Sequence, residues 1–137
     1  MEELITELLR EKEEIIFAYI FGSVVSGLDN KLSDVDLAIY VDEENIKETG
    51  SFGYRSRVIV ELEKAVGEKI DLVILNNASV TLSYEILQKG KLLFTRSNSL
   101  RREFQENIMR KYLDFLPLLA VQEKYQKKRL REGRFGR

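Results

Sequence analysis

Two carboxylates at alternate positions are the residues of this sequence best suited to chemistry. Asp34 and Asp36 flank Val35 and precede a run of branched and aromatic residues, 37–41, which favours a β-strand. Side chains two positions apart on a strand point to the same face, so both carboxylates should lie side by side. Two such charges repel each other unless a divalent cation lies between them. We therefore interpret Asp34 and Asp36 as metal ligands.

A second candidate feature is the pair Gly22–Ser23, which lies ten residues before Asp34. It directly follows the charge-free apolar run 15–21, whose length suits a strand buried on both faces. A strand that stops at Gly-Ser and turns into a short helix presents unpaired backbone N–H groups at its carboxyl end. The pattern predicts a phosphate-binding turn, with an ordinary turn as the simpler alternative.

A third acid, Asp71, lies in the apolar segment 70–75, which is predicted to be a strand. A carboxylate in such a run needs a partner, because an unpaired buried charge is costly. If the acid-bearing strands are neighbours, Asp34, Asp36 and Asp71 can surround a pair of magnesium ions. A strand-end cap is the simpler explanation for Asp71 alone. The order of all these features favours phosphoryl transfer, which depends mainly on positioning and charge neutralisation and needs no histidine.

The composition excludes several other chemistries. The 137 residues include no Cys and no His, which rules out disulfides, thiolate nucleophiles, Cys/His zinc sites and histidine bases. No charge-free apolar run approaches the roughly 20 residues of a membrane span, and the acidic amino terminus is unlike a signal peptide. We expect a cytoplasmic protein without a membrane partner. A single domain is expected, with a core over about 1–95 and a helical extension over about 98–137.

The elements that must position these residues follow from the hydrophobic periodicity. Strands are expected over 15–21, 35–41, 70–75 and 92–95, and helices over about 2–13, 52–66 and 80–88. The helix over 80–88 is expected to be capped by Ser79, Asn76 or Asn77. The helix from residue 52 should bury Phe52, Ile59, Leu62 and Val66. The polar segment 42–51 is expected to be a mobile loop near the site.

The last third of the chain should form a further helix, which Pro117 should kink or end. One apolar stripe along it comprises Phe104, Ile108, Tyr112, Phe115 and Leu119. The nearby Leu116, Leu118 and Val121 widen the apolar surface beyond one core face, which indicates a partner interface. Residues 124–137 carry seven Lys or Arg and are expected to be frayed, with a contact to RNA or to an acidic partner as the alternative.

The spacing Gly22-Ser23, ten residues, Asp34-Val35-Asp36-Leu37 resembles the signature of the polymerase-beta-like nucleotidyltransferase superfamily. The resemblance implies an α+β fold, in which helices pack on one side of a small mixed β-sheet. It also implies transfer of a nucleoside monophosphate from a triphosphate with two magnesium ions. In this reading Asp34, Asp36 and Asp71 are the catalytic, metal-binding carboxylates, and Gly22 and Ser23 bind the nucleotide.

Because little chain remains beyond such a core, the sequence is most similar to the minimal nucleotidyltransferases, which include MntA-type antitoxins. That group implies AMP transfer from ATP to a tyrosine of an adjacently encoded HEPN-type ribonuclease toxin. The alternatives are a non-catalytic antitoxin that only binds its partner, and a nucleotidyltransferase acting on RNA or on a small molecule such as an aminoglycoside. The complete set of acids argues against lost catalysis, and about 40 residues after the last strand are too few for a drug-binding domain. The identity of the triphosphate and a homo-oligomeric state stay open.

Overall fold

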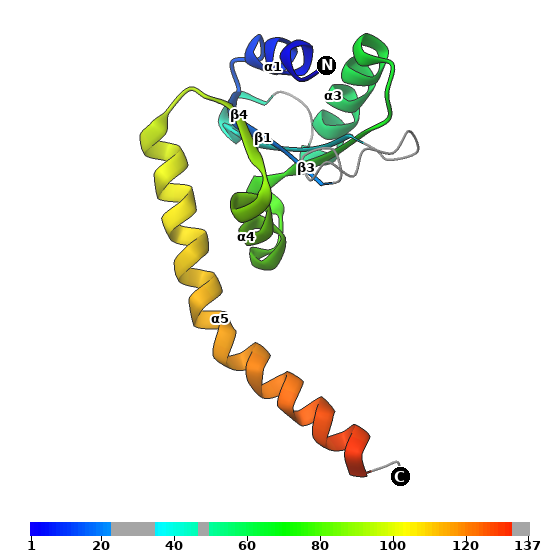
Figure 1. The fold of residues 1–137 in the computed structure, drawn as a ribbon. Helices are drawn as coiled ribbons and strands as arrows, with labels where there is room; N and C mark the ends of the chain where they lie inside the picture. Colours follow the sequence, from blue (N-terminus) through cyan, green and yellow to red (C-terminus); the bar gives the residue numbers. More distant parts are fainter. Residues whose placement is uncertain (23–34, 47–49, 133–137) are drawn as a thin grey trace.

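The computed structural model describes the backbone of residues 1–22, 35–46 and 50–132. Within these ranges, four strands form one sheet in the order β3-β2-β1-β4 (Figure 1). Strand β1 is antiparallel to both β2 and β4, whereas β2 and β3 are parallel, so the sheet is mixed as predicted. The predicted strands agree to within one residue at each end with β1 (Ile15–Phe21), β2 (Val35–Val41), β3 (Ile70–Ile74) and β4 (Lys91–Thr95).

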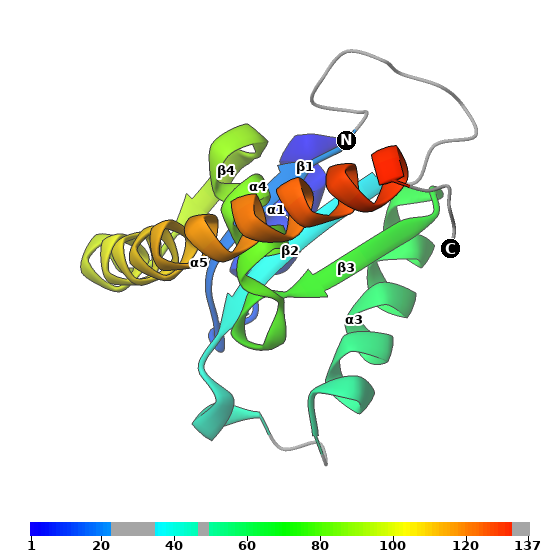
Figure 2. The same ribbon diagram turned by 90° about the horizontal axis from the view of Figure 1, so that it is seen from below.

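Helices cover both faces of this sheet. Figures 1 and 2 show α1 and α3 together on one side and α4 on the other. The described helices are α1 (Glu2–Arg10), α3 (Gly50–Val66), α4 (Val80–Lys89) and α5 (Asn98–Glu132), with short 3-10 turns η1 (Glu43–Asn45) and η2 (Leu75–Asn77). The fold class predicted from the resemblance, helices packed on a small mixed sheet, is therefore confirmed, but the expectation that the helices lie on one side of the sheet is wrong, because each face carries its own apolar residues to cover. Among the described helices, none is long and apolar enough to cross a membrane.

Each face of the sheet has its own hydrophobic core. The core beneath α1 and α3 includes Ile5, Leu9, Ile20, Leu37, Tyr54, Val58, Leu62 and Leu72. The core on the opposite face includes Phe17, Tyr19, Ala38, Leu75 and Ile86. Alternating residues of β1 enter the two cores, which explains why its sequence contains no charge and confirms that it is buried on both faces.

The buried face of α3 differs in part from the predicted one. Leu62 is buried and Ile59 and Val66 are partly buried, as expected, but Tyr54 and Val58 fill the core and were not predicted. The Tyr54 hydroxyl donates a hydrogen bond to Glu14 Oε2 at 2.7 Å, which satisfies the polar end of a ring whose body is buried. The side chain of Phe52 lies outside the described residues.

Helix α1 ends at Arg10, three residues before the predicted end. Arg96, which follows β4, donates hydrogen bonds to the carbonyls of Ile15 at 2.8 Å and Lys12 at 3.1 Å, and to that of Arg10. These carbonyls belong to the last residue of α1, the turn after it and the first residue of β1, and at the helix end the cationic donor replaces a missing intrahelical partner. A side chain more than 80 positions away thus helps to set the end of the helix.

Replacing Arg96 by Gln should therefore destabilise the fold. Hydrogen bonds from a charged donor contribute more than neutral ones, so we expect a loss of about 1–3 kcal/mol in the free energy of unfolding. Urea unfolding followed by circular dichroism would measure it. Arg102→Gln, an exposed position on α5, is the control and should change stability by less than about 0.5 kcal/mol. Equal effects of the two substitutions would contradict the role given to Arg96.

The segment 42–51, predicted to be a loop beside the site, is partly helical. Residues 43–45 form η1, capped by Asp42, which accepts hydrogen bonds from Glu44 N at 3.2 Å and Asn45 Nδ2 at 2.6 Å. Helix α3 begins at Gly50, two residues early. Asp36 is the second residue of β2 and Asp42 follows its last, so residues 42–46 lie at the other end of the strand from that acid. The prediction that it is near the site is wrong for this part, and its mobility stays a prediction.

The predicted cap of α4 is confirmed. Ser79 Oγ accepts a hydrogen bond from Leu82 N at 3.1 Å at the start of the helix. Asn76 has a different role, because its side chain accepts from Val41 N at 3.0 Å and donates to Val41 O at 2.8 Å. This amide thereby takes the place of a strand partner at the end of β2.

Helix α5 continues through Pro117, so of the two predicted effects of the proline, a kink or an end of the helix, the structure excludes the end. Figure 1 shows the helix changing direction in its orange part, as a proline kink would produce.

Residues 124–132, predicted to be frayed, are helical. Of the predicted stripe, Ile108 is buried, Phe104 packs on the sheet and Tyr112 stacks on Tyr84, but Phe115 is exposed. The side chain of Leu119 lies outside the described residues.

An ion pair between Lys12 and Glu61 at 2.5 Å joins the α1–β1 turn to α3. The hydrogen bond from Lys12 lowers the pKa of Glu61, against the opposing effect of burial, and the charges of Lys12 and Arg57 act in the same direction as the bond. Because the folded-state pKa is lowered, this stabilisation is present above the pKa of Glu in the unfolded chain. It is lost as the pH falls through the folded-state value.

Glu61→Gln should therefore destabilise the protein slightly at neutral pH. The side chain is 46% exposed, so we expect a loss of at most about 1 kcal/mol. The difference from the wild type should disappear in acid below the folded-state pKa, where Glu61 is protonated in both states. Urea unfolding at the two pH values would test this, and a loss that persists in acid would contradict the electrostatic origin.

Candidate active site

The turn after β1 approaches the carboxylate of Asp36. Phe21, the last residue of β1, pairs with Asp36 near the start of β2, and Gly22 follows with a φ of +86°. A Cβ atom at position 22 would overlap Oδ2 of Asp36 and lie 3.0 Å from its Cγ. Glycine is therefore needed here both for the left-handed backbone and for the close approach to the carboxylate.

Asp36 and Asp71 lie opposite each other on neighbouring strands. They are partners in the parallel register of β2 and β3, and strands paired in this way lie about 4.8 Å apart. The adjacent pair Leu37 and Leu72 points into the core beneath α1 and α3, so the two acids project toward the other face. Asp36 is half-buried, whereas the side chain of Asp71 is 51% exposed. The predicted condition that the acid-bearing strands are neighbours is met.

The structure thus brings three of the five predicted site residues, Gly22, Asp36 and Asp71, to one end of the sheet. The other two, Ser23 and Asp34, lie outside the described residues, as does the short helix predicted after Ser23. Among the described residues, no group of three or more Asp, Glu, His or Cys is arranged to hold a metal ion. The three-carboxylate site and the phosphate-binding role of Ser23 stay predictions.

Arg55 of α3 is a site residue that the sequence did not reveal. Its Nε donates a hydrogen bond to the Leu72 carbonyl at 2.6 Å, and its Nη2 contacts Asp71 Oδ1 at 3.2 Å. The expectation that Asp71 needs a partner is therefore met by Arg55, although the carboxylate is exposed at the sheet edge and not buried in the apolar run. The sequence indicated that Asp71 needs a positively charged partner, but it did not indicate that this partner is Arg55.

Open space adjoins this ion pair. A cavity of about 340 Å³ lies along the outer side of β3 and reaches η2 and α4. Its lining comprises Arg55, Asp71, Leu72, Val73, Ile74, Asn77, Ala78 and Leu82. A group bound in this cavity would be next to the Asp71 carboxylate.

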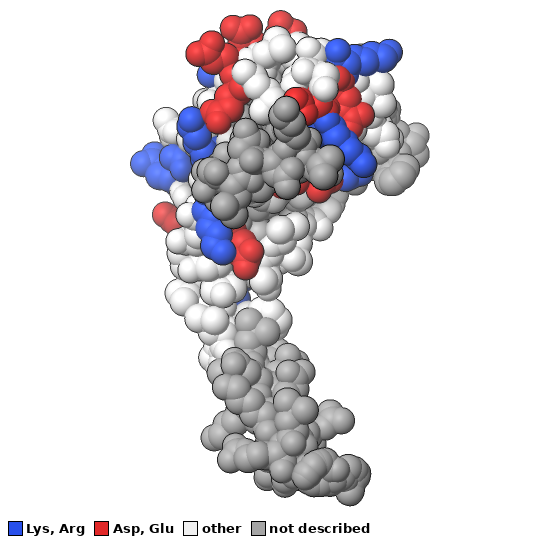
Figure 3. Space-filling view, turned by 45° about the vertical axis from the view of Figure 1, so that its right-hand side comes forward, with Lys and Arg blue, Asp and Glu red and all other residues white. Residues whose placement is uncertain are grey.

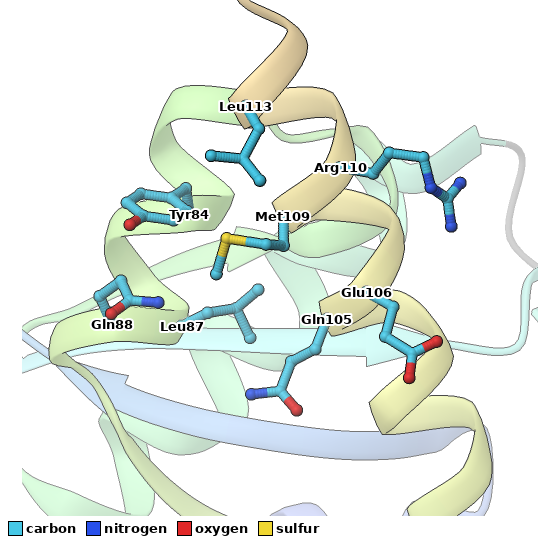
Figure 4. A pocket seen from close by; sticks show the side chains of 8 residues that line it. All are labelled: Tyr84, Leu87, Gln88, Gln105, Glu106, Met109, Arg110 and Leu113. Atoms are coloured by element: carbon cyan, nitrogen blue, oxygen red, sulfur yellow. The ribbon is translucent and has the colours of Figure 1, made fainter. Parts of the chain in front are cut away.

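A second cavity, of about 470 Å³, lies between α4 and α5, away from the acids. Figure 4 shows Met109 and Leu113 of α5 pointing toward Tyr84 and Leu87 of α4, while Arg110 points away from them. The centre of this cavity is apolar and offers few groups for acid–base chemistry. We therefore place the candidate active site at the end of β2 and β3 and not between α4 and α5.

Charges of both signs surround the described part of the sheet. On the face shown in Figure 3, Lys and Arg side chains are interspersed with Asp and Glu and do not gather into one basic surface. Binding of nucleic acid usually requires a continuous basic surface. Within the residues that the structure describes, this face therefore gives no support to an RNA partner. The side chains of the basic segment 124–137 are not among them.

A mixed sheet with paired acids beside a glycine turn defines a class of protein, and the family comparison identifies it. The model of the family "Polymerase beta, Nucleotidyltransferase" matches residues 3–99, and the chain belongs to this family. That range contains all five predicted site residues.

Two curated relatives are protein adenylyltransferases. The chain is 30% identical over 96 residues to the protein adenylyltransferase MntA of Shewanella oneidensis, a match that covers 68% of this chain and 64% of that protein. It is 26% identical over 114 residues to the MntA of Aphanizomenon flos-aquae, covering 80% and 76% of the two chains. The match to the Shewanella protein thus spans slightly less than two thirds of that protein.

Solved structures share the fold. A chain from a toxin–antitoxin complex with AMP-PNP has a TM-score of 0.75 at 24% identity, covering 91% of this chain and 98% of that one. A chain from a complex of tri-AMPylated Shewanella oneidensis HEPN toxin with MNT antitoxin has a TM-score of 0.68 at 23% identity, covering 92% and 99%. Both likenesses extend beyond the sheet into the carboxy-terminal region.

Proposed function

We propose that this protein is a magnesium-dependent adenylyltransferase that transfers AMP from ATP to a tyrosine of a HEPN-type toxin and thereby acts as its antitoxin. The observation that carries the proposal is the placement of Asp36 opposite Asp71, next to the turn at Gly22. The relatives support it, since two are named protein adenylyltransferases and similar folds occur in toxin–antitoxin complexes with AMP-PNP or with an AMPylated toxin. We also propose that residues 1–137 form one domain, with α5 as its extension.

The donor set fits magnesium. Asp36 and Asp71 offer only carboxylate oxygens, the ligands that this ion prefers, and Asp34 would add a third carboxylate from the same strand region. Bound magnesium would supply positive charge to the triphosphate and to the charge that develops during transfer. Ser23 and the amides that follow it would hold the outer phosphates, beside the close approach of Gly22 to Asp36.

The transfer itself requires one bond to form and one to break. The tyrosine oxygen would bond to the α-phosphorus of ATP while the bond from that phosphorus to the pyrophosphate oxygen breaks, leaving AMP on the tyrosine and releasing pyrophosphate. A phenol has a pKa near about 10, so its proton must be taken up during the attack. Asp71, whose carboxylate lines the cavity beside β3, is one candidate to accept this proton when it does not hold the metal, and a bound metal that makes the phenol more acidic is the other.

Labelled ATP would test the proposal directly. The protein is incubated with magnesium, ATP labelled at the α-phosphate and either the product of the adjacent reading frame or bulk tRNA. Label on a tyrosine of the neighbouring protein is the expected result. Label only in RNA would reject a protein acceptor. Binding of the neighbour without any label would reject catalysis and favour an antitoxin that acts by masking its partner.

A further inference from the structure

We infer that Arg55 is a positioning residue that fixes the Asp71 carboxylate for metal binding, an inference that rests on the proposed function. Arg55 belongs to α3, which covers the face of the sheet opposite to the acids. Its side chain reaches the edge strand β3 and contacts both the Leu72 backbone and the Asp71 side chain. A helix on one face of the sheet thereby holds a carboxylate that projects from the other.

The two contacts divide the guanidinium into an anchor and a clamp. The anchor is the 2.6 Å hydrogen bond from Nε to the Leu72 carbonyl, on the residue that directly follows Asp71. The clamp is the 3.2 Å contact from Nη2 to Asp71 Oδ1. Because the guanidinium is planar and rigid, fixing Nε on the backbone also fixes the direction of Nη2. The clamp takes Oδ1, which makes Oδ2 the oxygen to face a metal ion.

This arrangement suits positioning better than stabilisation. The side chains of Arg55 and Asp71 are 36% and 51% exposed, and ion pairs so exposed contribute little to stability. An exposed carboxylate on an edge strand can adopt several rotamers, of which the clamp selects one. Groups that orient metal ligands typically change metal affinity or activity by about 10- to 100-fold when removed.

The positive charge of Arg55 has an opposing effect. A guanidinium next to a metal ligand repels the cation, so removing it would tighten metal binding if charge alone mattered. If orientation outweighs repulsion, its removal weakens binding. The direction of the change therefore decides between the two effects. Lys at position 55 keeps the charge but lacks the planar fork, so it should not restore binding if orientation dominates.

The test measures metal binding without turnover. Binding of Mn²⁺ in the presence of AMP-PNP is followed by the electron paramagnetic resonance signal of the unbound ion, and thermal unfolding checks that each variant is folded. Arg55→Gln should raise the Kd for Mn²⁺ about 10- to 100-fold, and Arg55→Lys should raise it by a similar factor. The matched control is Arg57→Gln, two residues along α3, whose side chain is 45% exposed and pairs with Glu61. This control should bind Mn²⁺ as the wild type does.

A double variant separates positioning from a general structural role. With Asp71 replaced by Asn, Arg55→Gln should cause no further loss of Mn²⁺ affinity, because the group that it positions is already gone. The inference is overturned if Arg55→Gln binds Mn²⁺ like the control or more tightly, or if it weakens binding equally in the Asp71→Asn background. A wild-type protein that binds Mn²⁺ but labels no acceptor would overturn only the proposed function. Failure of the wild type to bind Mn²⁺ would overturn both.

Discussion

Replacing Asp36 by Asn should lower the rate of AMP transfer by at least about a thousand-fold. Asp36 lies between the Gly22 turn and Asp71, so it is the central carboxylate of the described site. Its charge would bind the magnesium that stabilises the reacting phosphates by several kcal/mol, and a thousand-fold corresponds to about 4 kcal/mol. The measurement is the initial rate of label transfer at saturating ATP, compared between Asp36→Asn and the wild type over a magnesium titration. Asp34→Asn is expected to lower the transfer rate by a factor of the same order.

The fold should survive this substitution. Asp36 faces Asp71 across neighbouring strands, so neutralising one of the two acids relieves a repulsion. Without divalent ions, the free energy of unfolding of Asp36→Asn should equal or exceed that of the wild type. Asp42→Asn, at the other end of β2, is the matched control and should keep its activity. Full activity of Asp36→Asn at every magnesium concentration would refute the assignment.

Gly22→Ala should lower the transfer rate by at least about a hundred-fold. The substituted Cβ would overlap Asp36 Oδ2, and the atom most able to move is that carboxylate oxygen. The collision is therefore relieved by displacing the group that binds the metal, and a misplacement of about 1 Å can cost about a hundred-fold in rate. The positive φ of +86° adds a stability loss of about 1–2 kcal/mol, measurable by urea unfolding.

Gly67 offers a control with the same backbone conformation. Its φ is +78°, but a Cβ atom there would meet nothing within 4 Å. Gly67→Ala should therefore lose a similar amount of stability and keep the wild-type transfer rate. If both alanine variants lost activity to the same extent, destabilisation would explain the loss. The contact between position 22 and Asp36 would then have no special role.

The strands that carry the site could be predicted because each has a local signal. The run 15–21 lacks charge, and the segments after Asp34 and Lys69 are rich in branched residues with turn residues at their ends. The pairing of Asp36 with Asp71 could be stated only as a condition, since periodicity does not determine strand order. Two strands joined by a helix, as β2 and β3 are joined by α3, often pair in parallel. Whether they are neighbours is nevertheless decided by the assembled sheet and not by either strand alone.

The features that the sequence did not reveal depend on distant partners. Arg55 is a partly exposed residue at the border of the buried face of α3, and only the edge position of β3 makes it a site residue. The early end of α1 depends on Arg96, which follows β4, the strand that pairs with β1 but is the last of the four in the sequence. Pro117 was expected to kink or end α5 from its local chemistry, and only the structure shows which, a bend with the helix continuing beyond it. Local rules are thus reliable for where strands lie and weaker for where helices end.

The order of the strands also affects the chain while it is being synthesised. β1 has one neighbour, β2, that follows it closely in the sequence, but its other neighbour is β4, which ends at residue 95. Synthesis at about 5–20 residues per second would take roughly 4–15 s to extend the chain from residue 21 to residue 95. Throughout that interval a charge-free apolar strand has an unpaired edge, open to strands of other nascent chains. The risk of aggregation during translation is therefore set by how late β4 emerges.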